Sequence, residues 1–335
     1  GITQSELSFH SQVESILLQV ELAYWDLQRA HRDLEVRKKS VEAAESLVGQ
    51  VEARLDAQTA SEADRVQAES GLAQRRITVL EAQRSLELQD RILKDLLFPD
   101  LRGTTARLDP VDEPELDLTL PDYDDVLAMA ETHRPELERA ALQIANAEDE
   151  LKVVRNNRLP QLDLEGAAGI NGLGGSFTSA IDDGREADNN NWSLGVVLRT
   201  PWPNRSARAA LALQESELRR QVIQARKVQR QIQLEVGEIH DRIVSSAQQL
   251  EARQIAVDFA RLSLENEKAK YDVQKATVHD LLQLETELQE AALGLYQATA
   301  EHRKHQATLR RVTGTLLDHW NIDLADDSAG VGDEP

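Results

Sequence analysis

Two long stretches of this chain carry the sequence features of uninterrupted helix. Residues 5–97 contain no proline, and their only glycines are Gly49 and Gly71. Residues 204–317 are helical in character as well, and at 1.5 Å per residue the part from Asn204 to Tyr271 would reach roughly 100 Å. A helix of that length needs neighbours along its whole length, because most helical stability comes from tertiary packing.

An apolar stripe with coiled-coil spacing runs along the second stretch. Aromatic residues are scarce, at 4 % of the chain, and charged residues reach 29 %, which favours long packed helices over a thick globular core. The stripe consists of Ile232, Val236, Ile239, Ile243, Ala247, Leu250, Val257, Leu264 and Tyr271. The sequence therefore predicts a mainly α fold built from long antiparallel helical hairpins.

Each stretch is broken once, and the two breaks resemble each other. Arg54–Ser61 aligns with Lys270–Thr277 without gaps. Each segment ends in Ser or Thr, and an acid follows three residues later, Asp64 in the first copy and Asp280 in the second, as in a capping box. Chance similarity of Ala/Leu/Gln-rich helices is the alternative explanation. The matched turns favour two copies of one long helical hairpin.

The segment between the two hairpins has a different texture. Residues 98–121 are interrupted by prolines and rich in acids, so they predict a connector, and residues 122–157 predict a further helix. Residues near 161–170 and 191–200 alternate apolar and polar side chains and are separated by a long polar loop. This pattern predicts two β-strands with one apolar face.

Charge and composition exclude several classes of function. A formal charge of -21 argues against nucleic acid and against anionic lipid as a partner. The chain has no cysteine, which excludes disulfides and thiolate metal sites within it. No run of about 18 or more apolar residues is present, so we expect no transmembrane helix.

The sequence contains no recognisable catalytic or metal-binding motif. No Ser/His/Asp set, phosphate loop or isolated acid pair is identifiable. His302 and His305 share one helix face, but Arg303 and Lys304 lie between them and no further ligand is evident. We therefore expect no enzymatic activity, no metal and no cofactor.

Four segments resemble the TolC-like outer-membrane efflux and secretion channels, and the resemblance covers about residues 10–317. No single segment decides the matter, but their order and spacing agree with that family. They are Ala23–Leu27, the passage from His133–Leu137 to Leu159–Leu164, the corner Leu198–Arg205, and Tyr271–Ala292.

The resemblance implies a passive outer-membrane exit duct of a tripartite efflux pump or a type I secretion system. It implies a homotrimer whose strands form a transmembrane β-barrel in outer-membrane lipid and whose hairpins form a periplasmic tunnel. Its partners would be a periplasmic adaptor (membrane fusion) protein and an inner-membrane transporter. The alternative is a soluble coiled-coil scaffold, and the strand segment at 160–200 discriminates, because a scaffold has no use for it.

The resemblance also predicts a division of the chain. Residues 1–97 would form the first hairpin, 98–157 an equatorial belt, 158–203 a two-strand piece of the barrel with its external loop, 204–317 the second hairpin, and 318–335 an acidic, disordered tail. Only the second hairpin is preceded by a strand pair, and the chain opens without an initiator Met, so we expect a truncated N-terminus with the first strand pair upstream.

The two turns are the expected adaptor-docking tips. The family usually has glycine at each turn, because glycine reaches a positive φ at little cost, whereas this chain has glutamine there. The tip residues are Gln58, Thr59, Ala60 and Ser61 in the first hairpin and Gln274, Lys275, Ala276 and Thr277 in the second.

The gate of the tunnel is expected at the second tip. Asp280 matches an acid of the family's aperture, and Asp64 holds the corresponding place in the first copy. Capping of a helix N-terminus explains both acids, and it is compatible with a ring of three Asp280 carboxylates at the narrow end of the tunnel, which we expect more for Asp280 than for Asp64. A second family acid falls on Gln283, and a bracing arginine of some members falls on Ala276, whereas Tyr271 matches the family's tyrosine.

Trp192 and Trp202 bracket the second predicted strand. Core packing is one explanation for them. An aromatic belt at the two faces of the membrane is the other, and it suits residues about ten apart on a membrane strand, so we favour it.

Overall fold

The computed structural model describes residues 4–97, 107–112, 118–170, 175–177, 181, 190–200 and 203–322. The chain divides into two compact units. The first comprises residues 1–136 and 229–335, and the second comprises residues 137–228.

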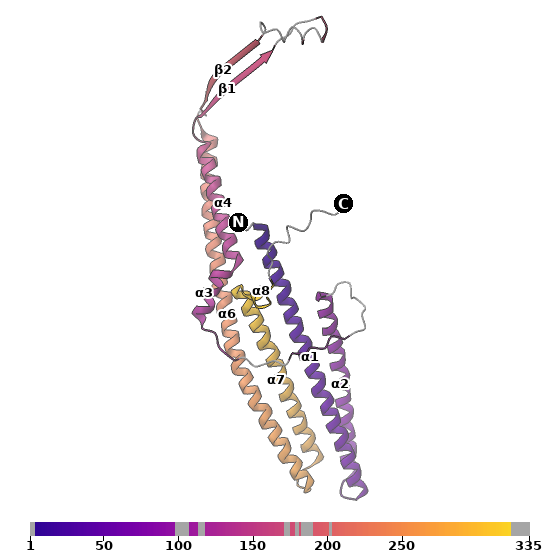
Figure 1. Cartoon of the computed structure of the whole chain (residues 1–335). Helices are drawn as coiled ribbons and strands as arrows, with labels where there is room; N and C mark the ends of the chain where they lie inside the picture. Colours follow the sequence, from indigo (N-terminus) through magenta and orange to yellow (C-terminus); the bar gives the residue numbers. More distant parts are fainter. Residues whose placement is uncertain are drawn as a thin grey trace. The chain divides into compact units, whose positions relative to one another are not determined.

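The first hairpin of unit 1 consists of α1 (Gln4–Asp56) and α2 (Glu62–Leu97) (Figure 1). Small residues alternate with leucines along its core, which lets the two helices approach closely. This core consists of Ala23, Leu27, Ala30 and Leu34 of α1 with Ala82, Leu86 and Leu93 of α2. The predicted hairpin and its break are confirmed.

The second hairpin consists of α6 (Arg205–Asp272) and α7 (Val278–Thr313), and the short α8 (Leu316–His319) follows it. Every residue of the predicted stripe from Ile232 to Tyr271 is buried. Because the whole stripe is buried, the predicted coiled-coil seam is confirmed. Helix α6 itself begins in unit 2 and continues into unit 1.

The helices of unit 1 lie in the order α2, α1, α7, α6 (Figure 1). Ion pairs join α1 to α7: Lys304 contacts Asp26 at 2.6 Å, and Arg310 contacts Glu21 at 3.0 Å. The two helices α2 and α6 therefore form the edges of this layer, and each has a side that no other described helix of the chain covers.

The aromatic segment near Ala23 ties three parts of unit 1 together. The Tyr24 hydroxyl donates to Asp112 at 2.5 Å, and Gln28 donates to the carbonyl of Asp112 at 2.9 Å, so the described part of the connector is fixed to α1. Trp25 lies under the Arg303 guanidinium of α7, 5.5 Å from ring centroid to Cζ. The segment Ala23–Leu27, which carries part of the family resemblance, therefore contacts both the connector and α7.

The predicted belt helix is two helices, α3 (Tyr123–His133) and α4 (Pro135–Asn156). Arg134 between them is buried and binds Glu136 at 3.0 Å and Glu235 of α6 at 2.9 Å. Gly314, with φ of 72°, ends α7 so close to His133 that a Cβ there would lie 2.8 Å from the His133 carbonyl oxygen. The α3–α4 junction thus holds the end of the second hairpin.

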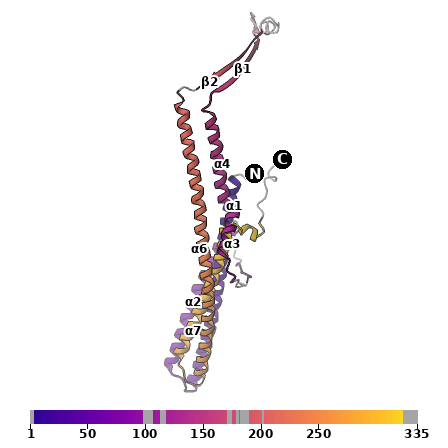
Figure 2. The ribbon, with the colours of Figure 1, turned by 90° about the vertical axis from the view of Figure 1, so that its left-hand side faces the viewer.

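Unit 2 contains most of α4, the first part of α6, and the antiparallel strands β1 (Gln161–Ile170) and β2 (Asn190–Arg199) (Figure 2). Leu162 pairs with Leu198, so apolar side chains share one face. On the other face Arg199 pairs with Asp163 and, at 2.8 Å, with Glu165. The two-strand piece with one apolar face is confirmed.

Some expectations meet the structure only in part. Helix α8 and the residues up to Ile322 are ordered, and Trp320 donates to Glu21 at 3.3 Å, so the tail begins later than residue 318. Its remainder, Trp202 and most of the connector at 98–121 lie outside the described residues. Among the helices described, none is both long and apolar enough to cross a membrane.

Candidate functional site

The two tip turns have the same backbone structure. In the first, the amide of Thr59 donates to the carbonyl of Arg54 at 2.8 Å, and that of Gln58 donates to Leu55 at 2.9 Å. The second repeats this pattern, with Lys275 donating to Lys270 at 2.8 Å. Both are Schellman motifs, which satisfy the last carbonyls of a helix. The structural repeat argues against chance similarity.

Glutamine takes the left-handed position in both turns. Gln58 has φ of 59° and Gln274 has φ of 61°. A left-handed conformation costs a non-glycine residue about 1–2 kcal/mol. The turn geometry that glycine would give is therefore kept at that cost, and the absence of glycine does not alter the path of the chain.

Both expected capping boxes are formed. The Asp280 amide donates to the Thr277 hydroxyl at 3.2 Å, and the Thr277 amide donates to the Asp280 carboxylate at 3.0 Å. Ser61 and Asp64 make the same pair of bonds at 2.9 and 3.2 Å. The Ser61 and Thr277 hydroxyls also donate to these carboxylates, at 2.7 Å in each tip, and these hydroxyl bonds, followed by the bonds from the Ser61 and Thr277 amides, lower the pKa of both carboxyl groups because they favour the charged form. Asp64 and Asp280 are therefore ionised around neutral pH.

The tips of the two hairpins share one apolar core. Ala60 and Ala276 are half-buried and pack against this core, so these two predicted docking residues do not face outward, whereas the other six tip residues are exposed. The core consists of Leu47, Val51 and Ala68 of the first hairpin with Leu264, Tyr271, Val278 and Leu281 of the second.

Arg54 links the first tip to Tyr271. Its guanidinium lies over the Tyr271 ring, 3.9 Å from Cζ to the centroid, and it donates to the Tyr271 carbonyl at 3.0 Å. It also approaches Asp272 at 3.5 Å. Tyr271 is only 5 % exposed, and burial raises its pKa. Sequence reasoning assigned Arg54 to the repeat without giving it a role, because its partner lies more than two hundred positions away.

A buried ion pair joins the hairpins above the tips. Arg75 of α2 lies 3.2 Å from Glu285 of α7, and both side chains are 8 % exposed. Arg75 also donates to Ser40 at 2.9 Å. Lys268 of α6 reaches the same carboxylate at 3.9 Å. Nothing in the spacing of these residues along the sequence predicts the pairing.

The other predicted gate residues lie on the exposed side of the second tip. Gln283 is exposed and donates to Glu287 at 3.0 Å, within its own helix. His279 beside Asp280 contacts Gln67 of the first hairpin at 3.0 Å. The structure therefore brings Tyr271 into the shared core and leaves Asp280 and Gln283 outside it.

Two further groups of predicted residues lie away from the tips. Trp192 is 80 % exposed on the apolar face of β2, as an interfacial residue would be. His302 is buried, and its Nδ1 lies 2.8 Å from the Ser246 hydroxyl, which itself donates to the carbonyl of Ile243 at 3.0 Å. Because the Ser246 hydroxyl donates to Ile243, its oxygen can accept from an Nδ1–H of His302. Among the described residues there is no group of three or more His, Cys, Asp or Glu that would hold a metal.

The chain thus combines two long helical hairpins, each with a capped tip, with a two-stranded antiparallel sheet. The family model for outer membrane efflux proteins matches residues 126–315, more than half of the chain. The chain therefore belongs to the outer membrane efflux protein family. No curated protein sequence matches it.

Solved structures support the same fold. The outer-membrane channel OprN superimposes with a TM-score of 0.75 at 19 % identity, covering 92 % of this chain and 68 % of its own. CusC gives 0.75 at 17 % identity, with 92 % and 70 % covered. VceC from Vibrio cholerae gives 0.72 at 18 % identity, with 92 % and 72 % covered.

Family and fold settle the class of this protein. It is an efflux channel protein of the Gram-negative outer membrane with a helical extension into the periplasm. The resemblance to TolC-like channels is confirmed, and the family is one of channels and not of enzymes.

Proposed function

We propose that this chain is a protomer of a homotrimeric, passive exit duct that serves a tripartite efflux pump or a type I secretion system. A periplasmic adaptor and an inner-membrane transporter would deliver the cargo, and the strands would lie in outer-membrane lipid. In this proposal residues 1–97 and 204–317 form the two hairpins of the tunnel, residues 98–157 form the belt, residues 158–203 form the strand pair with its external loop, and residues 318–335 form the tail. The strand pair argues against a soluble scaffold, which would expose its apolar face without purpose.

The uncovered apolar faces of the two edge helices carry the proposal. On α2 the exposed residues Ile77, Leu80, Leu88 and Ile92 recur at spacings of three, eight and four, so they share one helix face. On α6 the exposed residues Leu234, Ile255, Phe259 and Leu262 recur at 21, four and three. A helix needs a neighbour on such a face, so α2 of one copy would pack on α6 of the next and close a ring.

The antiparallel hairpins fix which residues would meet. Leu80 follows the start of α2 at Glu62, and Ile255 precedes the end of α6 at Asp272, by nearly the same number of residues. Each therefore lies about 26 Å from the tip turn of its own hairpin. The chain has no cysteine, so a double variant carrying L80C and I255C offers one unambiguous pair. In oxidised full-length protein we expect a covalent trimer on a non-reducing gel.

Leu234 provides the control for this experiment. It lies on the same face of α6 but about 30 Å further from the tip, so L80C with L234C should give no cross-linked species. Cross-linking of the control pair to the same extent, or only monomer from both pairs, would contradict the proposed ring.

The exposed tip residues are the proposed adaptor-docking surface. Val273 is 62 % exposed beside Gln274 and Lys275, so most of this apolar side chain faces away from the described part of the chain. Asp in place of Val273 should abolish export while the trimer still forms, whereas Thr should leave export nearly intact because it keeps the size of valine. Full export by the Val273→Asp variant at normal protein levels would exclude the tip as the docking surface.

The proposed gate is the ring of tip residues around Asp280. Tyr271 would hold the second hairpin against Arg54 of the first. The Asp280 carboxylates of three copies would face one another, with Gln283 one turn further along α7 and Asp64 nearby in the first hairpin. The interfacial aromatics Trp192 and Trp202 would fix the depth of the strands in lipid.

A further inference from the structure

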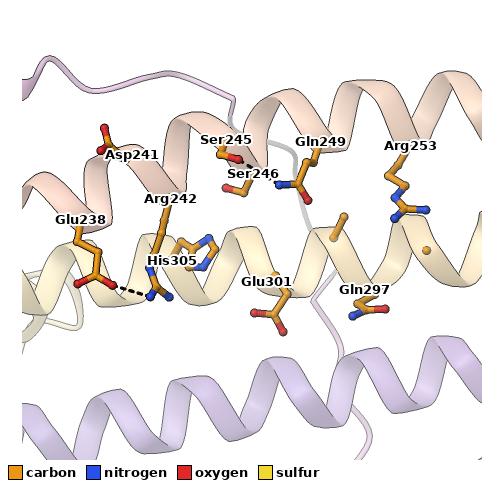
Figure 3. Close-up of a pocket in the computed structure, with 12 residues that line it drawn as sticks. Glu238, Asp241, Arg242, Ser245, Ser246, Gln249, Arg253, Gln297, Glu301 and His305 are labelled. Carbon is orange, nitrogen blue, oxygen red and sulfur yellow. Dashed lines mark hydrogen bonds and ion pairs between the residues drawn. The ribbon is translucent and has the colours of Figure 1, made fainter.

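A polar groove lies between α6 and α7 in unit 1 (Figure 3). Its volume is about 510 Å³. Its floor is lined by Ser245 and Gln249 of α6 and by Gln297 of α7, and charged side chains lie toward both ends. The efflux family and the tip contacts explain none of these residues.

The groove lies on the side of the helical layer that faces away from the belt. Gln233 and His240 of α6 contact the belt, through Glu131 at 3.4 Å and the carbonyl of Pro121 at 3.2 Å. Arg242 and Gln249, which line the groove, follow His240 by two and nine residues. At about 100° per residue, they lie roughly 180–200° around the helix from His240. If the belt surrounds the tunnel as proposed, the groove lines its interior.

One end of the groove is positive. The Arg253 side chain crosses α7 at Gly294, so closely that a Cβ at position 294 would lie 2.9 Å from an Arg253 guanidinium nitrogen. Glycine in a helix interior is unfavourable, so the space it leaves for Arg253 gives it a structural reason. Within the described part of the chain Arg253 has no ion-pair partner. A guanidinium in this position is suited to a carboxylate.

The other end of the groove is acidic. Arg242 is neutralised by Glu238 at 2.6 Å, whereas Asp241 and Glu301 add carboxylates. Glu301 shares Lys304 with Asp26, and Lys304 lies closer to Asp26, at 2.6 Å, than to Glu301, at 3.3 Å. The Glu301 side chain is half-exposed, and Lys304 makes this longer contact through Oε1, so the other carboxylate oxygen can face a cation in the groove.

His305 at the same end has a buried Nδ1 without a hydrogen-bond partner. Burial lowers the pKa of His305, although Glu301 opposes this, while Arg242, His302 and Lys304 act in the same direction as burial. The ring is therefore neutral near pH 7. An unsatisfied buried polar atom is unusual and points to a missing partner.

We propose that this groove is a weak binding site for zwitterions whose two charges are about 10 Å apart. Seven residues of α7 separate Gly294, beside Arg253, from Glu301, which corresponds to about 10 Å along the helix. The anionic end of the ligand binds Arg253, its cationic end binds Glu301, and the uncharged side chains between them hydrogen-bond its middle. The lumenal location of the site rests on the proposed duct.

Triglycine is a suitable probe, because three extended residues span about 10 Å and carry one charge at each end. Its controls are N-acetyl-triglycine, which lacks the positive charge, and triglycine amide, which lacks the negative one. Ligand-observed NMR titrations use the full-length trimer in lipid nanodiscs. We expect triglycine to bind at least five times more tightly than either control, and equal affinity for all three peptides would overturn the proposal.

Three variants separate the site from general effects. Arg253→Gln should weaken triglycine binding at least fivefold, whereas Arg261→Gln, an arginine of the same helix outside the groove, should leave it unchanged. Gly294→Ala should weaken binding because the guanidinium must shift, although alanine favours the helix. Unchanged binding in Arg253→Gln, or the same loss in Arg261→Gln, would overturn the assignment.

Planar-bilayer conductance distinguishes this inference from the proposed duct. Triglycine should lower the potassium chloride current of the wild type more than that of Arg253→Gln. A protein that conducts but binds the three peptides alike overturns the site alone. A protein that binds triglycine selectively but conducts no ions contradicts the duct and leaves the groove as a binding site.

Discussion

The buried ion pair between Arg75 and Glu285 should determine how firmly the two hairpins hold each other. Arg75→Ala removes the guanidinium and leaves the Glu285 carboxylate in a site that is 8 % exposed, with Lys268 at 3.9 Å as its remaining cation. Breaking one partner of a buried pair costs about 3–5 kcal/mol. Because Lys268 offsets part of this, we expect a loss of about 2–4 kcal/mol.

A double variant makes this expectation specific. Replacing Arg75 by Met and Glu285 by Leu exchanges the pair for apolar groups of similar size, and such exchanges are often neutral or stabilising. Each single change should therefore loosen the contact between α2 and α7, and the double change should restore it. The Ser40 hydroxyl loses its contact with Arg75 in Arg75→Met as well as in the double variant, so the comparison of these two isolates the unpaired Glu285 carboxylate, whereas Arg75→Ala also removes side-chain volume.

Amide hydrogen exchange in the full-length trimer measures the effect, because it reports local opening energies without requiring reversible unfolding. Peptides covering residues 70–80 and 280–290 should exchange roughly 30- to 1,000-fold faster in Arg75→Ala and near the wild-type rate in the double variant. Wild-type protection in Arg75→Ala, or equal loss of protection in the single and double variants, would refute the reasoning.

Two further predictions concern carboxyl groups. Asp280→Asn should lower cation selectivity in bilayer reversal potentials while leaving the fold intact, because asparagine also caps helices; an unchanged ratio means that Asp280 does not line the pore. Glu14 is buried, and burial together with Glu136 raises its pKa to about 7. Its contribution to stability should therefore fall as pH rises from about 4.5 to 7, and in Glu14→Gln the hydrogen-exchange protection of α1 should lose this part of its pH dependence.

The helical part of this fold was predictable because its signals are local. The periodic stripe from Ile232 to Tyr271, the two capping boxes and the alternation along β2 depend on residues close in sequence. The belt was predicted as one helical segment, 122–157, and Pro135 within it marks the first turn of α4, so that α3 ends just before Arg134. Contacts between the hairpins were not predictable, because neither Arg54 nor Arg75 indicates in the sequence which distant residue it binds.

The candidate site was predicted in position but not in detail. The capping role of Asp280 and Asp64 follows from spacing alone and is confirmed, whereas their role in a pore stays a prediction. Ala60 and Ala276 are half-buried against the shared core, which their positions in the turns did not indicate, and their role in docking stays a prediction. Glutamine in a left-handed conformation contradicts its intrinsic preference, and the surrounding backbone bonds determine it.

The Schellman geometry of both turns limits how any partner can recognise them. Its hydrogen bonds already satisfy the last carbonyls of α1 and α6, so a docking protein has little free backbone to bind there. At the proposed docking surface, recognition would then come from exposed side chains, those of Gln58 and Thr59 in the first tip and of Val273, Gln274 and Lys275 in the second. Substitutions at these positions that keep the turn geometry would change which partner binds without changing the helical hairpins. Channels with the same fold could therefore differ in their partners through a few side chains at the tips.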